Sequence, residues 1–171
     1  MTGTQLADID DNTRLRRSLI DLIIGVFRLN GALLVSGDAL VGDLGLTSAR
    51  WQVLGAIALS PVPVPVARLA RNMGLTRQAV QRSVDEMRND ELVRLDSNPH
   101  HRRAMLVTMT ELGSSAYRAA SERQKRWADA LARGLSPKET EAASLLMREL
   151  QRRLEASPSI TTTVRSDKKE V

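Results

Sequence analysis

The sequence predicts a mainly α-helical fold that carries one small β-hairpin. Apolar residues recur at three- and four-residue spacing over most of the chain, as in helices that turn one face toward a core. Two of the predicted helices are short and are joined by the segment NMGLT at residues 72–76. Directly after them, two apolar, alternating runs flank the polar segment DSNPHHRR at residues 96–103, which is the pattern of two antiparallel strands and a turn.

The composition excludes several classes of protein. Hydrophobic residues make up 42% and charged residues 26%, so the chain can bury a core. The absence of cysteine excludes disulfides and thiolate metal sites. The apolar run LIDLIIGVF at residues 19–27 is interrupted by Asp21 and is too short to cross a bilayer, so we expect a cytoplasmic protein without a membrane partner. A net charge of +5 favours an anionic partner, although weakly.

The two ends of the chain are predicted to be helical regions flanked by disordered segments. Residues 1–11 and the polar, aperiodic tail 157–171 are expected to be disordered. A helix is expected over residues 12–37, where Ser36-Gly37-Asp38 ends it, and further helices over residues 111–156. The apolar stripe of the first helix contains Leu15, Leu19, Leu22, Ile23, Val26, Asn30 and Leu33. These terminal helices are too apolar for a free monomer, which favours self-association.

The middle of the chain, residues 38–110, has the features of a separate lobe. Thr47 is placed to cap a helix that carries Trp51 and Leu54, because its hydroxyl can accept a hydrogen bond from a free N–H of the first turn. The segment SPVPVPV then forbids a helix and favours an extended connector over a ligand for proline-recognition domains. Gly74 is placed to end the next helix in a left-handed cap, and Thr76 to cap the one after it.

These two short helices and the hairpin predict a winged helix-turn-helix. With Val80, Val84 and Met87 turned inward, the outward positions of the second helix are Arg77, Gln78, Gln81, Arg82, Asp85 and Arg88. Arginine and glutamine make bidentate contacts to guanine and adenine in the major groove. Four arginines and no acidic residue lie between Val66 and Val84. This local charge imbalance predicts contacts with double-stranded DNA.

The basic tip of the hairpin, or wing, extends this prediction. A loop beside the recognition helix reaches the flanking minor groove, which is narrow, negative and attractive to arginine. Adjacent His100 and His101 point apart and have no third histidine or cysteine to join them, so no metal site and no cofactor are expected. The predicted DNA-binding residues are Arg68, Thr76, Arg77, Gln78, Gln81, Arg82, His100, Arg102 and Arg103.

Three segments together resemble the multiple antibiotic resistance regulator (MarR) family. They are LTSARWQVLGAIA, VARLARNMGLTRQAVQRSVDEMRNDELVRL and NPHHRRAMLVTMTELG, and the resemblance covers roughly residues 12–155. In the wing, the matching residues are Pro99, Arg102, Arg103, Ala104, Thr110 and Gly113. Asn98 and His101 stand where the family usually has aspartates, and the second of these commonly braces the wing by pairing with an arginine. Here the wing is either looser, more positive when His101 is protonated, or braced by Asp96 instead.

The resemblance implies a homodimeric, ligand-responsive repressor. Its first and last helices would interleave with those of a second copy. Its recognition helices, residues 76–90, and wings, residues 96–104, would bind a pseudo-palindromic operator. A small aromatic or phenolic effector would bind in a cleft and shift the spacing of the lobes. The candidate cleft residues are Phe27, Asn30, Arg50, Trp51 and Tyr117, although the scarcity of aromatic residues favours a core position for Trp51, and Asn30 is also interpretable as a residue that sets dimer register.

Two other functions receive less support from the sequence. The chain has no phosphate-binding loop, no nucleophile elbow and no paired carboxylates in an apolar setting, so we do not expect an enzyme. The alternative is a winged-helix module that binds only proteins. Such a surface would favour apolar anchors, whereas this one carries Arg77, Gln78, Gln81 and Arg82.

Overall fold

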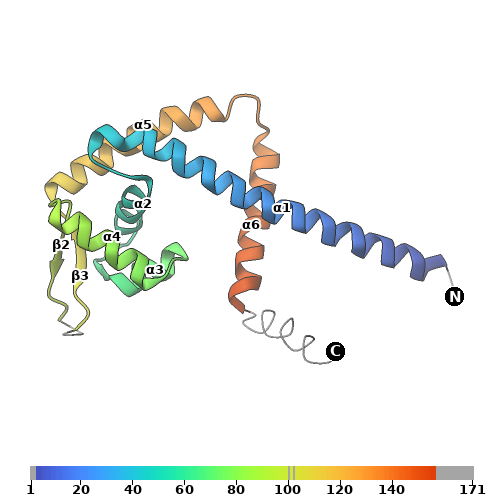
Figure 1. Ribbon diagram of the computed structural model, residues 1–171, viewed down its shortest axis with the longest axis horizontal. Helices are drawn as coiled ribbons and strands as arrows, with labels where there is room; N and C mark the ends of the chain where they lie inside the picture. Colours follow the sequence, from blue (N-terminus) through green and yellow to red (C-terminus); the bar gives the residue numbers. More distant parts are fainter. Residues whose placement is uncertain (1–2, 100, 102, 157–171) are drawn as a thin grey trace, which may run out of the picture. The chain divides into compact units, whose positions relative to one another are not determined.

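The computed structural model describes residues 3–99, 101 and 103–156. It divides into two compact units, which separate between Arg126 and Trp127 and are described here individually. The elements are α1 (Gly3–Val41), a 3-10 turn η1 (Gly42–Leu44), α2 (Ser48–Ala58), β1 (Val64–Pro65), α3 (Val66–Met73), α4 (Arg77–Asn89), β2 (Val93–Asp96), β3 (Leu106–Met109), α5 (Glu111–Leu131) and α6 (Pro137–Ala156) (Figure 1). The mainly α-helical fold with a β-hairpin is confirmed.

Helix α1 is longer at both ends than the sequence indicated. It begins at Gly3 and ends at Val41, whereas we expected a helix over residues 12–37 after a disordered segment, 1–11. The stop signal Ser36-Gly37-Asp38 fails because a tertiary contact uses these residues inside the helix. The Asp38 carboxylate accepts a hydrogen bond from the Ser48 N–H at 2.6 Å, and a side chain at Gly37 would overlap Ser48. At the other end, residues 3–7 include Gln, Leu and Ala, which favour helix.

The core of the first unit lies among α2, α3, α4 and the small sheet. Its fully buried residues are aliphatic and include Leu54 of α2, Leu69 of α3, Val84 and Met87 of α4 and Val107 of β3. The expected extended course of the proline-rich segment is confirmed, because β1 pairs with β3 and makes a three-stranded antiparallel sheet in the order β1-β3-β2. The β2–β3 hairpin extends beside α4 (Figure 1).

The hairpin is joined to α5 by a close contact at Gly113. Thr110 caps α5, since its hydroxyl accepts a hydrogen bond from the Gly113 N–H at 3.0 Å. A Cβ at Gly113 would fall on the carbonyl oxygen of Leu92, at the start of the hairpin. A glycine is therefore required where the wing and α5 meet.

The terminal helices leave large apolar surfaces exposed. In α1, Leu19 and Ile23 on the predicted stripe are exposed, and so are Ile20 and Ile24 on another side of the helix. The stretch from residue 11 to residue 44 is long and apolar enough for a membrane span. The shortness of the run LIDLIIGVF within it therefore does not by itself exclude one. The core helix of a protein with no membrane span passes the same test. In α6, among residues 137–156, no residue is buried.

Candidate nucleic-acid interface

The turn between α3 and α4 fixes where the second helix begins. Gly74 has φ 65°, in the left-handed region, and the N–H of Leu75 returns to the Ala70 carbonyl at 2.9 Å. Two residues later the Thr76 hydroxyl accepts a hydrogen bond from the Ala79 N–H at 3.2 Å. Both predicted caps are confirmed. They place α4 directly after α3 without a flexible linker, which is what a helix-turn-helix requires.

Helix α4 has one buried face and one solvent-exposed face. Val80, Val84 and Met87 are almost fully buried against the core. On the opposite face Arg77, Gln78 and Arg82 are exposed, and the Arg82 side chain retains 85% of its accessible surface. The inward and outward sets are those expected from the sequence. The helix is thus anchored by its apolar side and presents long polar side chains outward.

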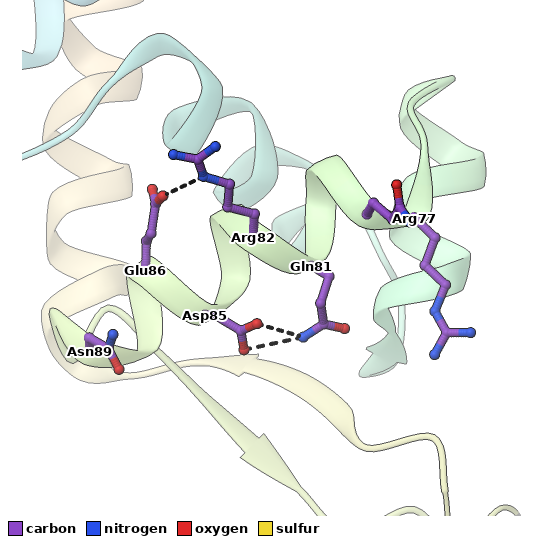
Figure 2. Close-up of a pocket in the computed structure, with 7 residues that line it drawn as sticks. Arg77, Gln81, Arg82, Asp85, Glu86 and Asn89 are labelled. Carbon is purple, nitrogen blue, oxygen red and sulfur yellow. Dashed lines mark hydrogen bonds and ion pairs between the residues drawn. The ribbon is translucent and has the colours of Figure 1, made fainter.

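Two carboxylates of α4 hold two of these outward side chains. The Gln81 Nε2 lies 3.2 Å from each carboxylate oxygen of Asp85, and the Arg82 Nε lies 3.1 Å from a carboxylate oxygen of Glu86 (Figure 2). Both pairs have the i, i+4 spacing that brings side chains together on a helix. Arg77 extends away from the helix without taking part in these pairs (Figure 2). The exposed face therefore has an ordered pattern of donors and acceptors.

Arg50 connects the beginning of α2 to the end of α4. Its guanidinium lies 2.7 Å from Asp90 and 3.6 Å from Glu86, and only 20% of the side chain is exposed. Glu86 is thus shared between Arg50 and Arg82. A partly buried arginine that bridges two helices with two carboxylates restricts their relative movement more than an exposed pair on one helix does.

The wing is closed at its base by Asp96. The Asp96 carboxylate accepts a hydrogen bond from the Thr108 hydroxyl at 2.8 Å and one from the Arg94 Nε at 3.0 Å. The Thr108 hydrogen bond and then the Arg94 guanidinium lower the pKa of Asp96 below its usual value. Asp96 therefore joins β2 to β3 through Thr108 and pairs with Arg94 of its own strand, in agreement with the interpretation in which Asp96 braces the wing.

The tip of the wing is ordered by a side-chain amide. Asn98, one of the departures from the family pattern, donates from Nδ2 to the Ala104 carbonyl at 3.0 Å. Between these residues, the His101 N–H donates to the Asn98 carbonyl at 3.2 Å, and the Ala104 N–H donates to the His101 carbonyl at 3.0 Å. The amide of Asn98 thus links the two sides of the turn between β2 and β3.

A pocket of about 510 Å³ lies between α4 and the wing. Its polar lining comes from Arg77 and Gln81 of the helix and from His101 and Arg103 of the wing, and no acidic residue is among the described residues that line it. A second, shallower pocket runs along the outer face of α4 and is lined by Arg77, Gln81 and Arg82 among others (Figure 2). Arg77 and Gln81 belong to both pockets and so lie where helix and wing meet.

The structure places most of the predicted DNA-binding residues on one unit. Arg68, Thr76, Arg77, Gln78, Arg82 and Arg103 are exposed and Gln81 is half-exposed, while His100 and Arg102 lie outside the described residues. Of these, Arg77, Gln81 and Arg103 line the same pocket. Their contact with DNA remains a prediction.

The five predicted effector-binding residues are not brought together in one pocket. Phe27 and Asn30 are exposed on α1. Arg50 is engaged by Glu86 and Asp90, and Trp51 and Tyr117 are half-buried and pack against the hydrophobic core. The pockets at α4 and the wing are lined by other residues. For Trp51 the structure agrees with the core interpretation.

Sequence reasoning missed the acidic residues of this surface. By sequence alone Asp85, Glu86 and Asp90 are interpreted as helix-surface charges, and the structure adds that they hold Gln81, Arg82 and Arg50. The i, i+4 spacing of the first two pairs was a usable signal. No local signal links Arg50 to Asp90, because these two residues are far apart in the sequence and meet only through the packing of α2 on α4.

Comparison with known proteins identifies the class of this fold. A family model described as the MarR family matches residues 44–104. An uncharacterised protein of Mycobacterium tuberculosis is 39% identical over 114 residues, which are 64% of this chain and 78% of the relative. The transcriptional activatory protein BadR of Rhodopseudomonas palustris is 32% identical over 89 residues, or 51% of each chain. The solved structure of Staphylococcus aureus MarR in complex with salicylate and kanamycin superposes with a TM-score of 0.69 at 13% identity, over 84% of this chain and 95% of that one.

Fold, interface and relatives thus define a winged helix-turn-helix protein of the kind that binds DNA. The chain belongs to the MarR family of transcription regulators. The matched segment, residues 44–104, runs from the end of the 3-10 turn through α2, α3, α4 and the wing, so it contains most of the interface described above.

Proposed function

We propose that this protein is a homodimeric, ligand-responsive repressor that binds a pseudo-palindromic operator. The proposal is carried by one observation: α4 buries Val80, Val84 and Met87 while it presents Arg77, Gln81 and Arg82 beside a basic wing. In the proposed complex α4 enters the major groove and the wing follows the adjacent minor groove. Residues 76–90 and 96–104 are then the DNA-binding segments.

Dimerisation is supported by the exposed apolar surfaces of the terminal helices. Leu19, Ile23 and Phe27 of α1 are exposed, and so are Leu145 and Leu154 of α6. A helix that is apolar on several sides needs cover from other chains or from lipid. For a MarR-family chain a second copy is the simplest cover, since it also supplies the second recognition helix for a two-fold symmetric operator.

Ligand response is supported by a structural relative. One solved structure is of Staphylococcus aureus MarR in complex with salicylate and kanamycin. We propose that a small aromatic or phenolic acid acts on the present protein by favouring one spacing of the two recognition helices over another. A thermal-shift screen with such acids tests this, and an active compound should raise the melting temperature and weaken DNA binding. If no compound in the panel does both, this part of the proposal is wrong.

The DNA-binding part is tested by mobility-shift titration with DNA from upstream of the gene. Wild-type protein should retard a fragment at low salt, and binding should fall steeply with salt because phosphate contacts release counterions. Arg77→Ala should weaken binding by about 1–3 kcal/mol. The matched control is Arg118→Ala, since Arg118 is an exposed arginine on α5 that pairs with Glu111. Equal losses in both variants would remove Arg77 from the interface.

A further inference from the structure

Asp85 lies on the outer face of α4. Its side chain is acidic, whereas affinity for the phosphate backbone comes from basic side chains. We propose that Asp85 is a positioning residue that fixes the orientation of the Gln81 amide and thereby makes Gln81 select adenine at one position of each operator half-site. This inference rests on the proposed function, because it requires α4 to lie in the major groove.

The geometry of the pair determines which end of the amide faces outward. The Gln81 Nε2 is 3.2 Å from both oxygens of the Asp85 carboxylate. An ionised carboxylate only accepts hydrogen bonds, so the reversed amide would place two acceptors against each other. The amide nitrogen therefore faces Asp85, and Figure 2 shows the amide oxygen turned away from it. One hydrogen of the amide nitrogen is used by Asp85, and the other hydrogen and the oxygen remain available.

Asp85 is itself held in place by more than Gln81. The Arg88 guanidinium lies 3.9 Å from its carboxylate, one turn further along α4. About 45% of the Asp85 side chain is exposed, so the carboxylate lies partly against the helix surface. Gln81 is placed between Asp85 and the wing, and it lines both the pocket on the outer face of α4 and the pocket beside the wing. The oriented amide is thus at the centre of the proposed interface.

An amide held in this orientation matches one base edge. In the major groove adenine offers a donor, the N6 amino group, beside an acceptor, N7. The free oxygen of Gln81 can accept from N6 while the remaining N–H donates to N7. Guanine offers two acceptors, N7 and O6, so the fixed oxygen of Gln81 would meet O6 without a proton between them. A freely rotating amide would discriminate less, because it could present either end.

A purely structural role for Asp85 makes a different prediction. Gln–Asp pairs at i, i+4 stabilise helices slightly whatever the helix binds. In that case, loss of the carboxylate would change the stability of α4 and the affinity for all DNA sequences alike. The discriminating quantity is therefore the ratio of affinities for duplexes that differ at one base pair.

The experiment is selection of binding sites from a randomised duplex pool with the full-length protein, followed by titration of single-base variants. Wild type should enrich adenine at one symmetric position, with a preference of about 5- to 150-fold over the other bases. Gln81→Ala should lose that preference and so identify the position. Asp85→Ala should lose most of it while binding to unrelated DNA is not weakened, since a negative charge near the phosphates is removed.

Two further variants control this result. Asp129→Ala makes the same change at an exposed residue of α5 and should retain the wild-type preference. The side chain of Asp85→Asn can accept or donate a hydrogen bond, so it tolerates both orientations of the Gln81 amide. Its preference for adenine should therefore lie between those of wild type and Asp85→Ala. Circular dichroism establishes that each variant is folded, and Asp85→Asn serves if Asp85→Ala is not.

The outcomes separate this inference from the proposed function. If no sequence is enriched by the wild type and no duplex is bound, the proposed function itself fails. If sites are enriched and Asp85→Ala keeps the wild-type base preference, the role of Asp85 is wrong and the DNA-binding proposal stands. A Gln81-dependent position that prefers guanine would also overturn the role of Asp85.

Discussion

The lobe formed by α2, α3, α4 and the sheet differs from the terminal helices in how it buries its apolar residues. In the lobe, Leu54, Leu69, Val84 and Met87 are almost completely inaccessible to solvent. In α1 and α6, leucines and isoleucines of the same size remain exposed, and Phe27 retains 73% of its accessible surface. The lobe thus buries its core within a single chain, whereas α1 and α6 leave apolar side chains exposed.

This difference separates two sources of stability. Burial of a leucine or isoleucine contributes about 1.5–3 kcal/mol when the side chain leaves water, and the lobe gains this from its own residues. In the proposed dimer the terminal helices would gain it by association, so their contribution would depend on protein concentration. Substitutions in the two regions should therefore have different effects, which the following predictions test from the largest effect to the smallest.

The largest effect is expected in the core of the lobe. Leu54→Ala should lower the free energy of unfolding by about 2–5 kcal/mol, because it leaves a cavity where the side chain was completely buried. Urea denaturation followed by circular dichroism measures this at two protein concentrations. A loss below about 1 kcal/mol would mean that the lobe is not packed as described.

A charge on the apolar stripe of α1 should act on association instead. Leu19→Asp should raise the dimer dissociation constant at least tenfold, or about 1.4 kcal/mol, because the carboxylate would be desolvated between two chains. Sedimentation velocity over a concentration series measures it.

Ala32→Asp is the control for this substitution, since at 100° per residue Ala32 lies about 140° around α1 from Leu19 and next to Arg28. If wild type is monomeric at all concentrations, or if both variants dissociate equally, the contrast between lobe and terminal helices has a different cause.

The lobe was also the part of the fold that the sequence predicted best, because its signals are local. Thr47, Gly74 and Thr76 each act on backbone groups within three or four residues, and all three were identified correctly. The limits of α1 were not, because Asp38 is engaged by Ser48 from the next helix. A tertiary partner outweighed a local stop signal there.

The cap of α4 should have an intermediate effect. Thr76→Ala should lower the free energy of unfolding by about 1 kcal/mol. The substitution removes the hydroxyl that accepts a hydrogen bond from the Ala79 N–H at 3.2 Å. The loss belongs to the lobe and should not depend on protein concentration. Thr76→Ser keeps a hydroxyl at the same place and should remain within about 0.5 kcal/mol of wild type in the same urea experiment. Equal losses in the two variants would indicate that the methyl group, not the cap, matters.

The smallest effect is expected from the base of the wing at low pH. Hydrogen bonds from Thr108 and Arg94 lower the pKa of Asp96 from its ordinary value of 3.8, so the ionised form is favoured in the folded state. The resulting stabilisation is complete above the unfolded pKa, near 3.9, and is lost as the pH falls through the lower, folded value. The free energy of unfolding of Asp96→Asn should lie below that of wild type at neutral pH.

Urea midpoints measured between about pH 2 and pH 7 test this, and the gap between Asp96→Asn and wild type should close below about pH 4. Asp43→Asn is a useful comparison, because Arg123 lowers the pKa of Asp43 in the same way at a site away from the wing. If the difference in urea midpoint between Asp96→Asn and wild type stays constant with pH, the stabilisation does not come from the charge of Asp96.

The candidate interface was predictable in its residue types but not in its internal pairing. The outward positions of α4 follow from the helical period once Val80 and Val84 are placed inside. The pair Gln81–Asp85 follows from the same period, yet acidic residues on a helix surface are usually solvated, so the spacing by itself carried little weight. The partners of Arg50 required three-dimensional packing.

The Arg50 contacts have a mechanical consequence. The first turn of α2 accepts a restraint from each of two helices, because Asp38 of α1 binds the Ser48 N–H and Asp90 at the end of α4 binds Arg50. That turn is therefore a point of contact shared by α1 and α4. The tilt of α1 and the direction of α4 are therefore coupled, because a rotation of either helix must turn the other, break the Ser48–Asp38 hydrogen bond or break the Arg50–Asp90 ion pair.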